Sequence, residues 1–229
     1  MVEVAMGVSL RSVIEQSADA SASSAPRITS VLMGVSNALI SAGDLDVAVS
    51  YESMKAIGSG LGSASFIVIG DGTDGVELAA GVSRFLAVES CGQCTACKQD
   101  GLKVFDGLQA LVSGDATELH VLEIRDRLRT VTDGARCGLA GQQQLVIGSI
   151  LDAFEDDVES HLLVERSPGL PFVISALDSL EMSGDELDRS ILLKRPDWTY
   201  AESNEVDESE PLFNSCRSPA ERMADLQHF

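Results

Sequence analysis

The stretch Cys91-Gly-Gln-Cys94-Thr-Ala-Cys97 decides how the rest of this sequence is interpreted, because it places three cysteines within seven residues. A fourth cysteine, Cys137, follows forty residues later, and a fifth, Cys216, lies in an acidic segment near the end. Two residues separate each cysteine of the run from the next, so one loop can turn three sulfur atoms toward a common centre. Such clustering is typical of metal thiolates in a reducing compartment, not of secreted disulfide frameworks.

Two kinds of metal site suit four thiolates. A C-x2-C-x2-C run completed by a remote cysteine is a usual ligand pattern of a [4Fe–4S] cluster. Structural zinc sites also use four thiolates, but they commonly take them from two separated pairs. The pattern therefore favours iron–sulfur over zinc, and cysteines that bind nothing are the third alternative. Cys216, which lies away from the run, is predicted to be a spare surface thiol.

The residues around the cysteines have the apolar spacing of amphipathic helices. Four helical segments are predicted, at Val76–Glu89, at Cys97–Val112, from a capping-box-like start at Asp115–Glu118, and roughly at Gly141–Leu163. Short connections between such segments indicate a helical bundle. Cys97 would open the second helix, whose N-terminal N–H groups favour an anionic group, and Cys137 would lie in the turn before the fourth helix.

The first seventy residues combine short strands with a few helical turns. Strands are predicted at Val2–Ala5, Ile28–Met33 and Ser65–Ile69, and short helices at Leu10–Ile14, after the N-cap Ser9, and at Tyr51–Ile57. The glycine-rich run Gly58–Gly62 precedes a strand, whereas a dinucleotide-binding loop follows a strand and opens a helix. The predicted fold class is α+β, with a small mixed unit over residues 1–70 and a helical bundle over residues 74–165.

Residues 166–229 depart from both patterns. Pro168 and Pro171 interrupt the helical period, and five acidic residues fall within Glu202–Glu210, so we expect a mostly irregular, flexible and acidic tail. Trp198, the only tryptophan, predicts either a docking segment or simple packing on the bundle. The histidines, which form no recognisable catalytic arrangement and are expected to be solvated or packed, are His120, His161 and His228.

The composition excludes several classes of partner. The chain has 229 residues, and 16 Lys and Arg against 36 Asp and Glu give a net charge of −20. Nucleic acids and anionic membranes both attract clustered cations, which this chain lacks. No apolar run approaches the roughly 20 residues that span a bilayer, and the N-terminus has no signal-peptide pattern. We therefore expect a cytoplasmic protein with no nucleic-acid partner and no direct membrane insertion.

The segment Glu89–Cys97 resembles the cluster loop of the flavin-carrying, NADH-binding subunit of respiratory complex I. The same loop occurs in the related diaphorase subunits of NAD-dependent formate dehydrogenases and hydrogenases. The resemblance covers about residues 1–163 and includes Val2–Gly7, Leu10–Glu15, Val31–Ser36, Ser50–Ser63, Phe66–Ile69, Arg136–Ala140 and Ile150–Phe154. It implies that residues 1–70 form an SLBB-like β-grasp unit whose first strand is missing.

The resemblance also implies a cofactor. It identifies the ligands of a [4Fe–4S] cluster as Cys91, Cys94, Cys97 and Cys137. In the family this cluster takes electrons from FMN, which NADH reduces, and passes them to further iron–sulfur centres. The family's FMN and NADH domain is not found in the sequence, so neither FMN nor NAD is expected on this chain alone. The chain by itself is then not expected to oxidise NADH.

The function implied is an electron-transfer module of a complex I-like NADH dehydrogenase or of an NAD-linked formate dehydrogenase or hydrogenase. It would relay electrons from a flavin on another chain, in the cytoplasm or at the periphery of a membrane complex. The expected partners are that flavin- and NADH-binding chain and other iron–sulfur subunits. The alternative is a non-redox interaction or scaffold protein, a split or decayed paralogue that binds zinc or no metal. An open sheet edge at the missing strand motivates this alternative.

The sequence departs from the family pattern near the cysteines. Ala96 replaces the usual proline before the third cysteine, and Lys98–Gly101 replaces the usual Arg-Glu-Gly after it. In the β-grasp unit, Met33–Val35 replaces the usual Pro-Gly-Gly. These changes remove no ligand, although they can alter the rigidity of the loop or the potential of the cluster. Lys98 and Arg136 flank expected ligands and either offset cluster charge or are ordinary surface cations.

Overall fold

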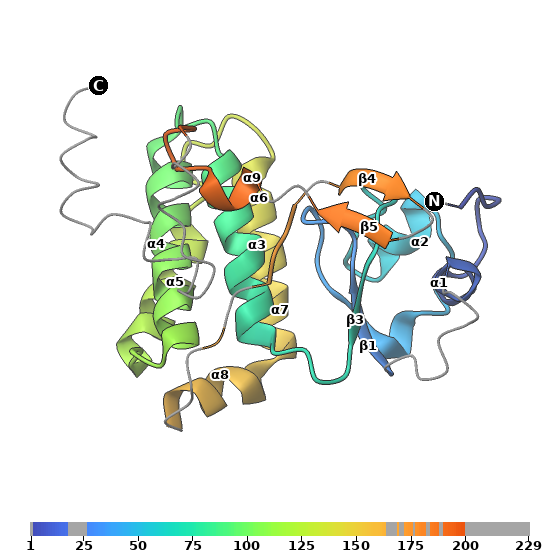
Figure 1. Ribbon diagram of the computed structural model, residues 1–229, viewed down its shortest axis with the longest axis horizontal. Coiled ribbons are helices and arrows are strands. Elements are labelled where there is room, and N and C mark those ends of the chain that lie inside the picture. Colours follow the sequence, from blue (N-terminus) through green and yellow to red (C-terminus); the bar gives the residue numbers. More distant parts are fainter. Residues whose placement is uncertain are drawn as a thin grey trace.

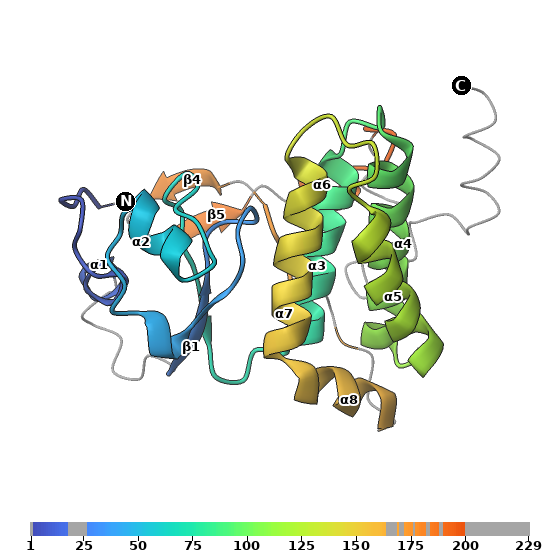
Figure 2. The same cartoon turned by 180° about the vertical axis from the view of Figure 1, so that it is seen from behind.

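A computed structural model describes residues 2–17, 27–163, 169, 172–175, 177–181, 184–187 and 190–199. In these residues a small antiparallel sheet with short helices stands beside a helical bundle (Figures 1 and 2). The predicted α+β class is therefore confirmed. No helix in the described part of the chain is long and apolar enough to cross a bilayer.

The sheet has three antiparallel strands in the order β2–β1–β3. Its strands are β1 (Ile28–Leu32), β2 (Ile40–Ser41) and β3 (Ile67–Gly70), and its accompanying helices are α1 (Leu10–Ser17), the 3₁₀ turn η1 (Ala42–Asp44) and α2 (Tyr51–Ala56). Val31 of the central strand packs in a core with Leu10 and Met54 of these helices. Leu32 and Ile69 instead join the core of the bundle, so the sheet is buried between the two cores.

The start of the chain differs from the prediction, because residues 2–5 form no strand. The backbone turns at Gly7, where φ is +92°, and this sharp turn prevents the preceding residues from running along the sheet. Only one isolated antiparallel bridge, between Ser9 and Ala48, forms nearby in the described residues. The N-cap prediction is confirmed, since the Ser9 hydroxyl accepts the Ser12 N–H at 3.2 Å.

Amphipathic helices build the bundle, as predicted. They are α3 (Gly75–Glu89), α4 (Thr95–Ser113), α5 (Glu118–Thr130), a continuous helix made of α6 (Leu139–Gln142), the π-helical turn η2 (Gln143–Ile147) and α7 (Gly148–Ala153), and finally α8 (Glu155–Leu163). α3 packs against α4 and α7, and α4 packs against α5. Their shared core includes the fully buried side chains of Leu78, Leu108 and Ile150.

The predicted fourth helix is interrupted at Phe154, which has φ −120° and ψ 42°. The Phe154 ring lies against Gly75 so closely that a Cβ on Gly75 would be 2.2 Å from the Phe154 Cβ. After this break α8 turns beneath the start of α3, where Asp157 accepts the Gly75 N–H at 2.8 Å. Contacts between distant segments therefore override the helical period at this point.

The predicted start of α5 is also corrected. The capping box is made by Thr117 and His120, and it does not use Asp115 with Glu118. The Asp115 N–H instead donates to the Ala110 carbonyl at 2.9 Å, so Asp115 belongs to the end of α4. His120 is thus a helix cap, a role that neither of the expected alternatives, solvated or packed, described.

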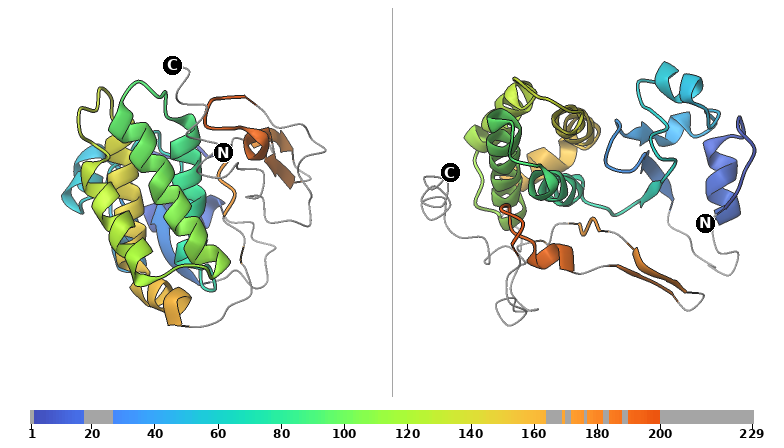
Figure 3. Two further views of the ribbon diagram at one scale, coloured as in Figure 1. Left: turned by 90° about the vertical axis from the view of Figure 1, so that its left-hand side faces the viewer. Right: turned by 90° about the horizontal axis from the view of Figure 1, so that it is seen from above.

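The described part of the extension carries more regular structure than the expected irregular tail. It contains the hairpin β4 (Leu177–Glu181) and β5 (Gly184–Leu187) and the short helix α9 (Ser190–Leu193). α9 and the turn that follows it lie against the bundle near the ends of α3 and α4 (Figure 3). The acidic run Glu202–Glu210, His228 and Cys216 lie outside the described residues.

Candidate metal centre

The loop between α3 and α4 presents the three clustered cysteines. α3 ends at Ser90, whose extended conformation (ψ 135°) directs the chain away from the helix, and Gly92 turns it back with φ +71°. Cys94 is the N-cap of α4, so the helix begins at Thr95. Cys97 therefore lies in the first helical turn and does not open the helix as predicted. Cys91 and Cys94 precede that turn, on the loop itself.

Cys137 reaches the same end of the bundle from a different connection. It lies in the turn between α5 and α6, as expected. Two hydrogen bonds hold this turn, from the Asp133 N–H to the Thr130 carbonyl (2.8 Å) and from the Ala135 N–H to the Thr132 carbonyl (3.1 Å). The turn also needs the left-handed conformation of Gly134, at φ +65°.

The four cysteines line one cavity with a volume of about 90 Å³. They enter it from the two connections just described, and all four are free thiols. Cys97 is buried at the inner side, whereas Cys91 and Cys137 are exposed. The remaining lining residues are Glu89, Gly92, Ala135, Arg136, Leu139 and Ala140. The sequence expectation that these four cysteines come together therefore agrees with the geometry of the cavity.

The electrostatics of the cavity follow from this proximity. Burial raises the pKa of the Cys97 thiol, and negative charge on Cys137, Cys94 and Cys91 raises it further. The positive charge of Lys98 acts in the opposite direction. Because each thiolate disfavours the next, bound iron would supply the positive charge that allows all four to ionise together. The uncapped N-terminal N–H groups of α4, where the Cys94 side chain makes no cap hydrogen bond, favour negative charge in the same place.

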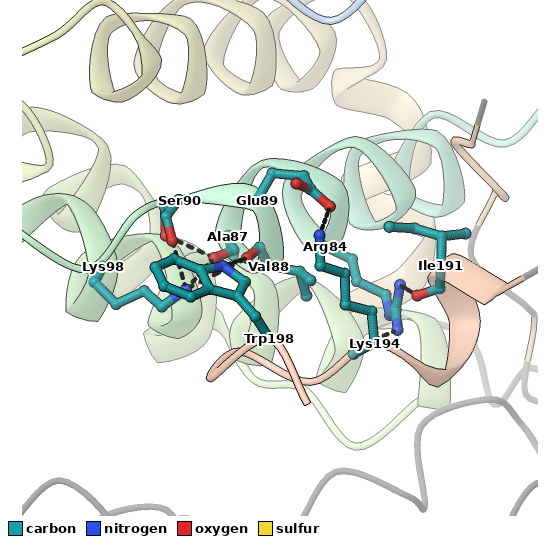
Figure 4. Close-up of polar contacts among 9 residues, drawn as sticks. All are labelled: Arg84, Ala87, Val88, Glu89, Ser90, Lys98, Ile191, Lys194 and Trp198. Atoms are coloured by element: carbon teal, nitrogen blue, oxygen red, sulfur yellow. Dashed lines mark hydrogen bonds and ion pairs between the residues drawn. The ribbon is translucent and has the colours of Figure 1, made fainter. Parts of the chain in front are cut away.

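Of the two interpretations of Lys98, an offsetting charge and an ordinary surface cation, the structure favours the first, because the Lys98 charge acts on Cys97, and it adds a structural role. The Lys98 side chain is half-buried, and its ammonium donates to the carbonyls of Ala87 and Ser90, each at 2.9 Å (Figure 4). Burial lowers its pKa to about 8, although the nearby Cys97 and Cys91 charges oppose that shift. Lys98 therefore connects the first turn of α4 to the last turn of α3. Arg136 lies in the cavity lining, as a residue next to Cys137 would.

The donor set fits an iron–sulfur cluster. Four thiols with one buried and two exposed members offer soft sulfur ligands from more than one side of a cavity, and each thiolate of a [4Fe–4S] cluster binds a different iron. Four thiolates also suit a single zinc ion, which would hold all four about 2.3 Å from one centre.

Comparison with known families agrees with this geometry. Residues 77–161 match the NADH-ubiquinone oxidoreductase-F iron-sulfur binding region. These residues belong to that family of regions, here called the oxidoreductase-F region. The oxidoreductase-F region begins in α3 and ends in α8, so it contains the cysteine loop, Cys137 and the helices that position them.

Similar proteins carry the oxidoreductase-F region within longer chains. An F-type component of the NADH-quinone oxidoreductase of Rhizobium meliloti is 31% identical over 169 residues, which are 72% of this chain and 39% of the relative. The HndC component of the NADP-reducing hydrogenase of Solidesulfovibrio fructosivorans is 29% identical over 168 residues, or 73% of this chain and 34% of the relative. The chain thus spans little more than a third of the length of these curated relatives.

Solved structures share the fold. Crystal structures of an NAD+-reducing [NiFe]-hydrogenase, in the H2-reduced and air-oxidized states, superpose with TM-scores of 0.58 and 0.59 at 21% identity. Each comparison covers 69% of this chain and 26% of the hydrogenase chain. At this level of identity the likeness concerns the fold alone.

Proposed function

We propose that the chain binds a [4Fe–4S] cluster and acts as an electron-transfer module. Its ligands would be Cys91, Cys94, Cys97 and Cys137. The observation that carries this proposal is that four thiols from two separate connections line one cavity inside the oxidoreductase-F region. When bound, such a cluster supplies reversible one-electron redox chemistry.

The residues of this chain would hold and tune that centre. Leu139 and Ala140 line the cavity and restrict water, which influences the potential of an iron–sulfur centre. Lys98 holds its positive charge beside Cys97, where it favours the reduced and more negative state. The net charge of −20 has the opposite effect and favours a low potential. The two exposed cysteines mark the side of the cavity at which a redox partner can approach closely.

The partner is proposed from the relatives' names, which describe components of an NADH-quinone oxidoreductase and of an NADP-reducing hydrogenase. We infer that electrons come from a flavin on an NADH-binding chain and go to other iron–sulfur subunits of a complex I-like enzyme, or of an NAD-linked formate dehydrogenase or hydrogenase. In this proposal residues 1–70 are an SLBB-like β-grasp unit, residues 74–165 carry the cluster, and residues 166–229 form an extension.

Metal analysis after anaerobic purification tests the cluster. Roughly four irons and four sulfides per chain, with an electron paramagnetic resonance signal of a reduced cubane, are expected. Serine in place of any one of Cys91, Cys94, Cys97 or Cys137 should reduce the iron content and alter or abolish the signal. Cys216→Ser makes the same chemical change outside the matched region 77–161 and should leave both at the wild-type level. Stoichiometric zinc, or a folded chain without metal, would instead support the non-redox scaffold alternative.

A further inference from the structure

The segment 190–199, here called the clamp, binds the outside of α3 beside the cysteine loop. Arg84 of α3 is only 8% exposed, and its guanidinium donates to the Ile191 carbonyl at 3.0 Å (Figure 4). It also donates to the Leu192 carbonyl at 3.0 Å. The Lys194 ammonium lies 2.6 Å from the Glu89 carboxylate, at the last residue of α3. The clamp is therefore attached along α3 up to the point where the loop begins.

Trp198 makes the contact nearest to the cysteines. Its indole N–H donates to the Val88 carbonyl at 3.1 Å, and its ring lies 5.7 Å from the Lys98 ammonium, a cation–π distance (Figure 4). Although the side chain is 46% exposed, the backbone is held at φ +66°, which is strained for a tryptophan. The turn that holds it is closed by a hydrogen bond from the Trp198 N–H to the Arg195 carbonyl (2.9 Å).

The contacts of Lys98 and Trp198 satisfy carbonyls in the last turn of α3. The last carbonyls of a helix have no partner within the helix and must be satisfied from elsewhere. Here Lys98 donates to the carbonyls of Ala87 and Ser90, and Trp198 donates to that of Val88. Together with the Ser90 hydroxyl, which also donates to Ala87, these side chains satisfy the last turn. Because Lys98 follows Cys97 directly, the same arrangement joins both ends of the cysteine loop.

We propose that the clamp positions the cysteine loop and that Trp198 is its positioning residue. The clamp lies outside the matched region 77–161 and binds the bundle that the oxidoreductase-F region forms. Its expected effect is a loop held close to the ligand arrangement, which slows both exposure of Cys97 and release of a bound cluster. The second effect rests on the proposed function, but the first does not.

The first test measures the rate at which iodoacetamide alkylates Cys97 in the cluster-free full-length chain, read by peptide mass spectrometry. Trp198→Ala should raise this rate about tenfold, because a hydrogen bond and a cation–π contact are lost. Trp198→Phe keeps a ring over Lys98 but loses the N–H donor, so an intermediate rate of about threefold is expected. Far-ultraviolet circular dichroism confirms that each variant is folded.

Phe172→Ala provides a matched control. Phe172 belongs to the same extension and lies against α3 far from the loop, where its backbone N–H donates to the Glu77 carbonyl (3.0 Å); the substitution removes its 41% exposed ring and keeps that bond. It should leave Cys97 alkylation at the wild-type rate. Equal rates in Trp198→Ala and wild type, or a rise in Phe172→Ala as large as that in Trp198→Ala, would overturn the proposal.

The second test follows loss of the visible absorbance of the loaded protein in the presence of an iron chelator. Trp198→Ala should lose its cluster about tenfold faster than wild type, and Phe172→Ala at the wild-type rate. Equal rates of cluster loss in Trp198→Ala and wild type would overturn the proposal that Trp198 slows release of the cluster. If the wild-type chain takes up no iron and sulfide, the proposed function is wrong. The alkylation rates still test whether the clamp positions the cysteine loop.

Discussion

The unpaired backbone groups at the two ends of α3 are satisfied, and each end is thereby closed, by different kinds of contact. At the N-terminal end, Asp74 accepts the Val76 N–H at 2.9 Å and also lies 2.9 Å from the buried imidazole of His161, on α8. At the C-terminal end, the half-buried Lys98 and the partly exposed Trp198 close the last turn beside a cavity. The first end joins elements of the bundle to one another, whereas the second joins the bundle to a loop and to an extension.

Because of this difference, we expect substitutions at one end of α3 to affect the stability of the fold and substitutions at the other end to affect the cysteine loop. The N-terminal closure is buried in the bundle, since the other ring nitrogen of His161 lies 2.9 Å from the Leu111 carbonyl of α4. Its loss should weaken the entire helical bundle. The C-terminal closure involves exposed and half-buried groups, so its loss should loosen mainly the cysteine loop. Substitutions at the two ends can therefore be compared directly.

The largest effect on stability is expected from Asp74→Ala. The change removes a helix cap and leaves the buried His161 without its carboxylate, which should lower the free energy of unfolding by about 2–4 kcal/mol. Chemical denaturation measures this. Iron content per folded chain should remain at the wild-type value, because the cavity lies at the other end of α3.

Asp71→Ala is the matched control for Asp74→Ala, since Asp71 is exposed and only three residues earlier. Its unfolding free energy should stay within about 0.5 kcal/mol of wild type. If Asp74→Ala lost iron at full folding, the proposed separation between the two ends would be wrong.

Lys98→Met should affect the cysteine loop more than the stability of the fold, which is the reverse of the result expected for Asp74→Ala. The Ser90 carbonyl loses its ammonium donor and the Ala87 carbonyl keeps only the Ser90 hydroxyl, so we expect cluster loss to become several-fold faster, by about one hydrogen bond to a charged group. The free energy of unfolding should fall by only about 1 kcal/mol, because removing a half-buried ammonium offsets part of the loss. Lys103→Met, on an exposed site of the same helix, should change neither quantity. A stability loss as large as that of Asp74→Ala would contradict the comparison.

The predictable parts of the molecule are those with local signals. The cysteine spacing identifies the loop, and the helical period gives α3 to within one residue. The period also gives α4, although it puts the start at Cys97, because nothing in the residue pattern distinguishes the N-cap Cys94 from a loop cysteine.

The features that the sequence does not predict depend on contacts between distant residues. The helix break at Phe154 follows from its approach to Gly75, seventy-nine residues earlier, and no local signal marks it. The roles of Lys98 and Trp198 require the clamp to fold back across α3, a placement that a single tryptophan in a polar segment does not specify. The only tryptophan beside Lys194 and Arg195 is the one available signal, and it leaves docking and packing equally open.

The smallest effect is expected from Asp197→Asn, within the clamp. The Asp197 carboxylate accepts from the Thr199 hydroxyl at 2.7 Å and from the Thr199 N–H at 3.1 Å. The bond from the Thr199 hydroxyl is the main cause that lowers the pKa of Asp197 below its usual 3.8; burial opposes it, and the backbone bonds and the charge of Arg195 lower the pKa further. Asparagine keeps an acceptor but not the charge, so Cys97 alkylation should rise only about twofold.

The pH dependence of that ratio follows from the lowered pKa. A carboxylate with a depressed pKa in the folded state stabilises the fold above the unfolded value of 3.8, and this contribution is lost as the pH falls through the folded pKa. The ratio of alkylation rates between Asp197→Asn and wild type should therefore stay constant from about pH 6.5 to about pH 5, a range below the pKa of about 8 of Lys98, which the Asp197 charge raises. The exposed Asp71→Asn should give a ratio near one throughout. A ratio that changes within this range would show that another group, and not the Asp197 carboxylate, holds the turn that carries Trp198.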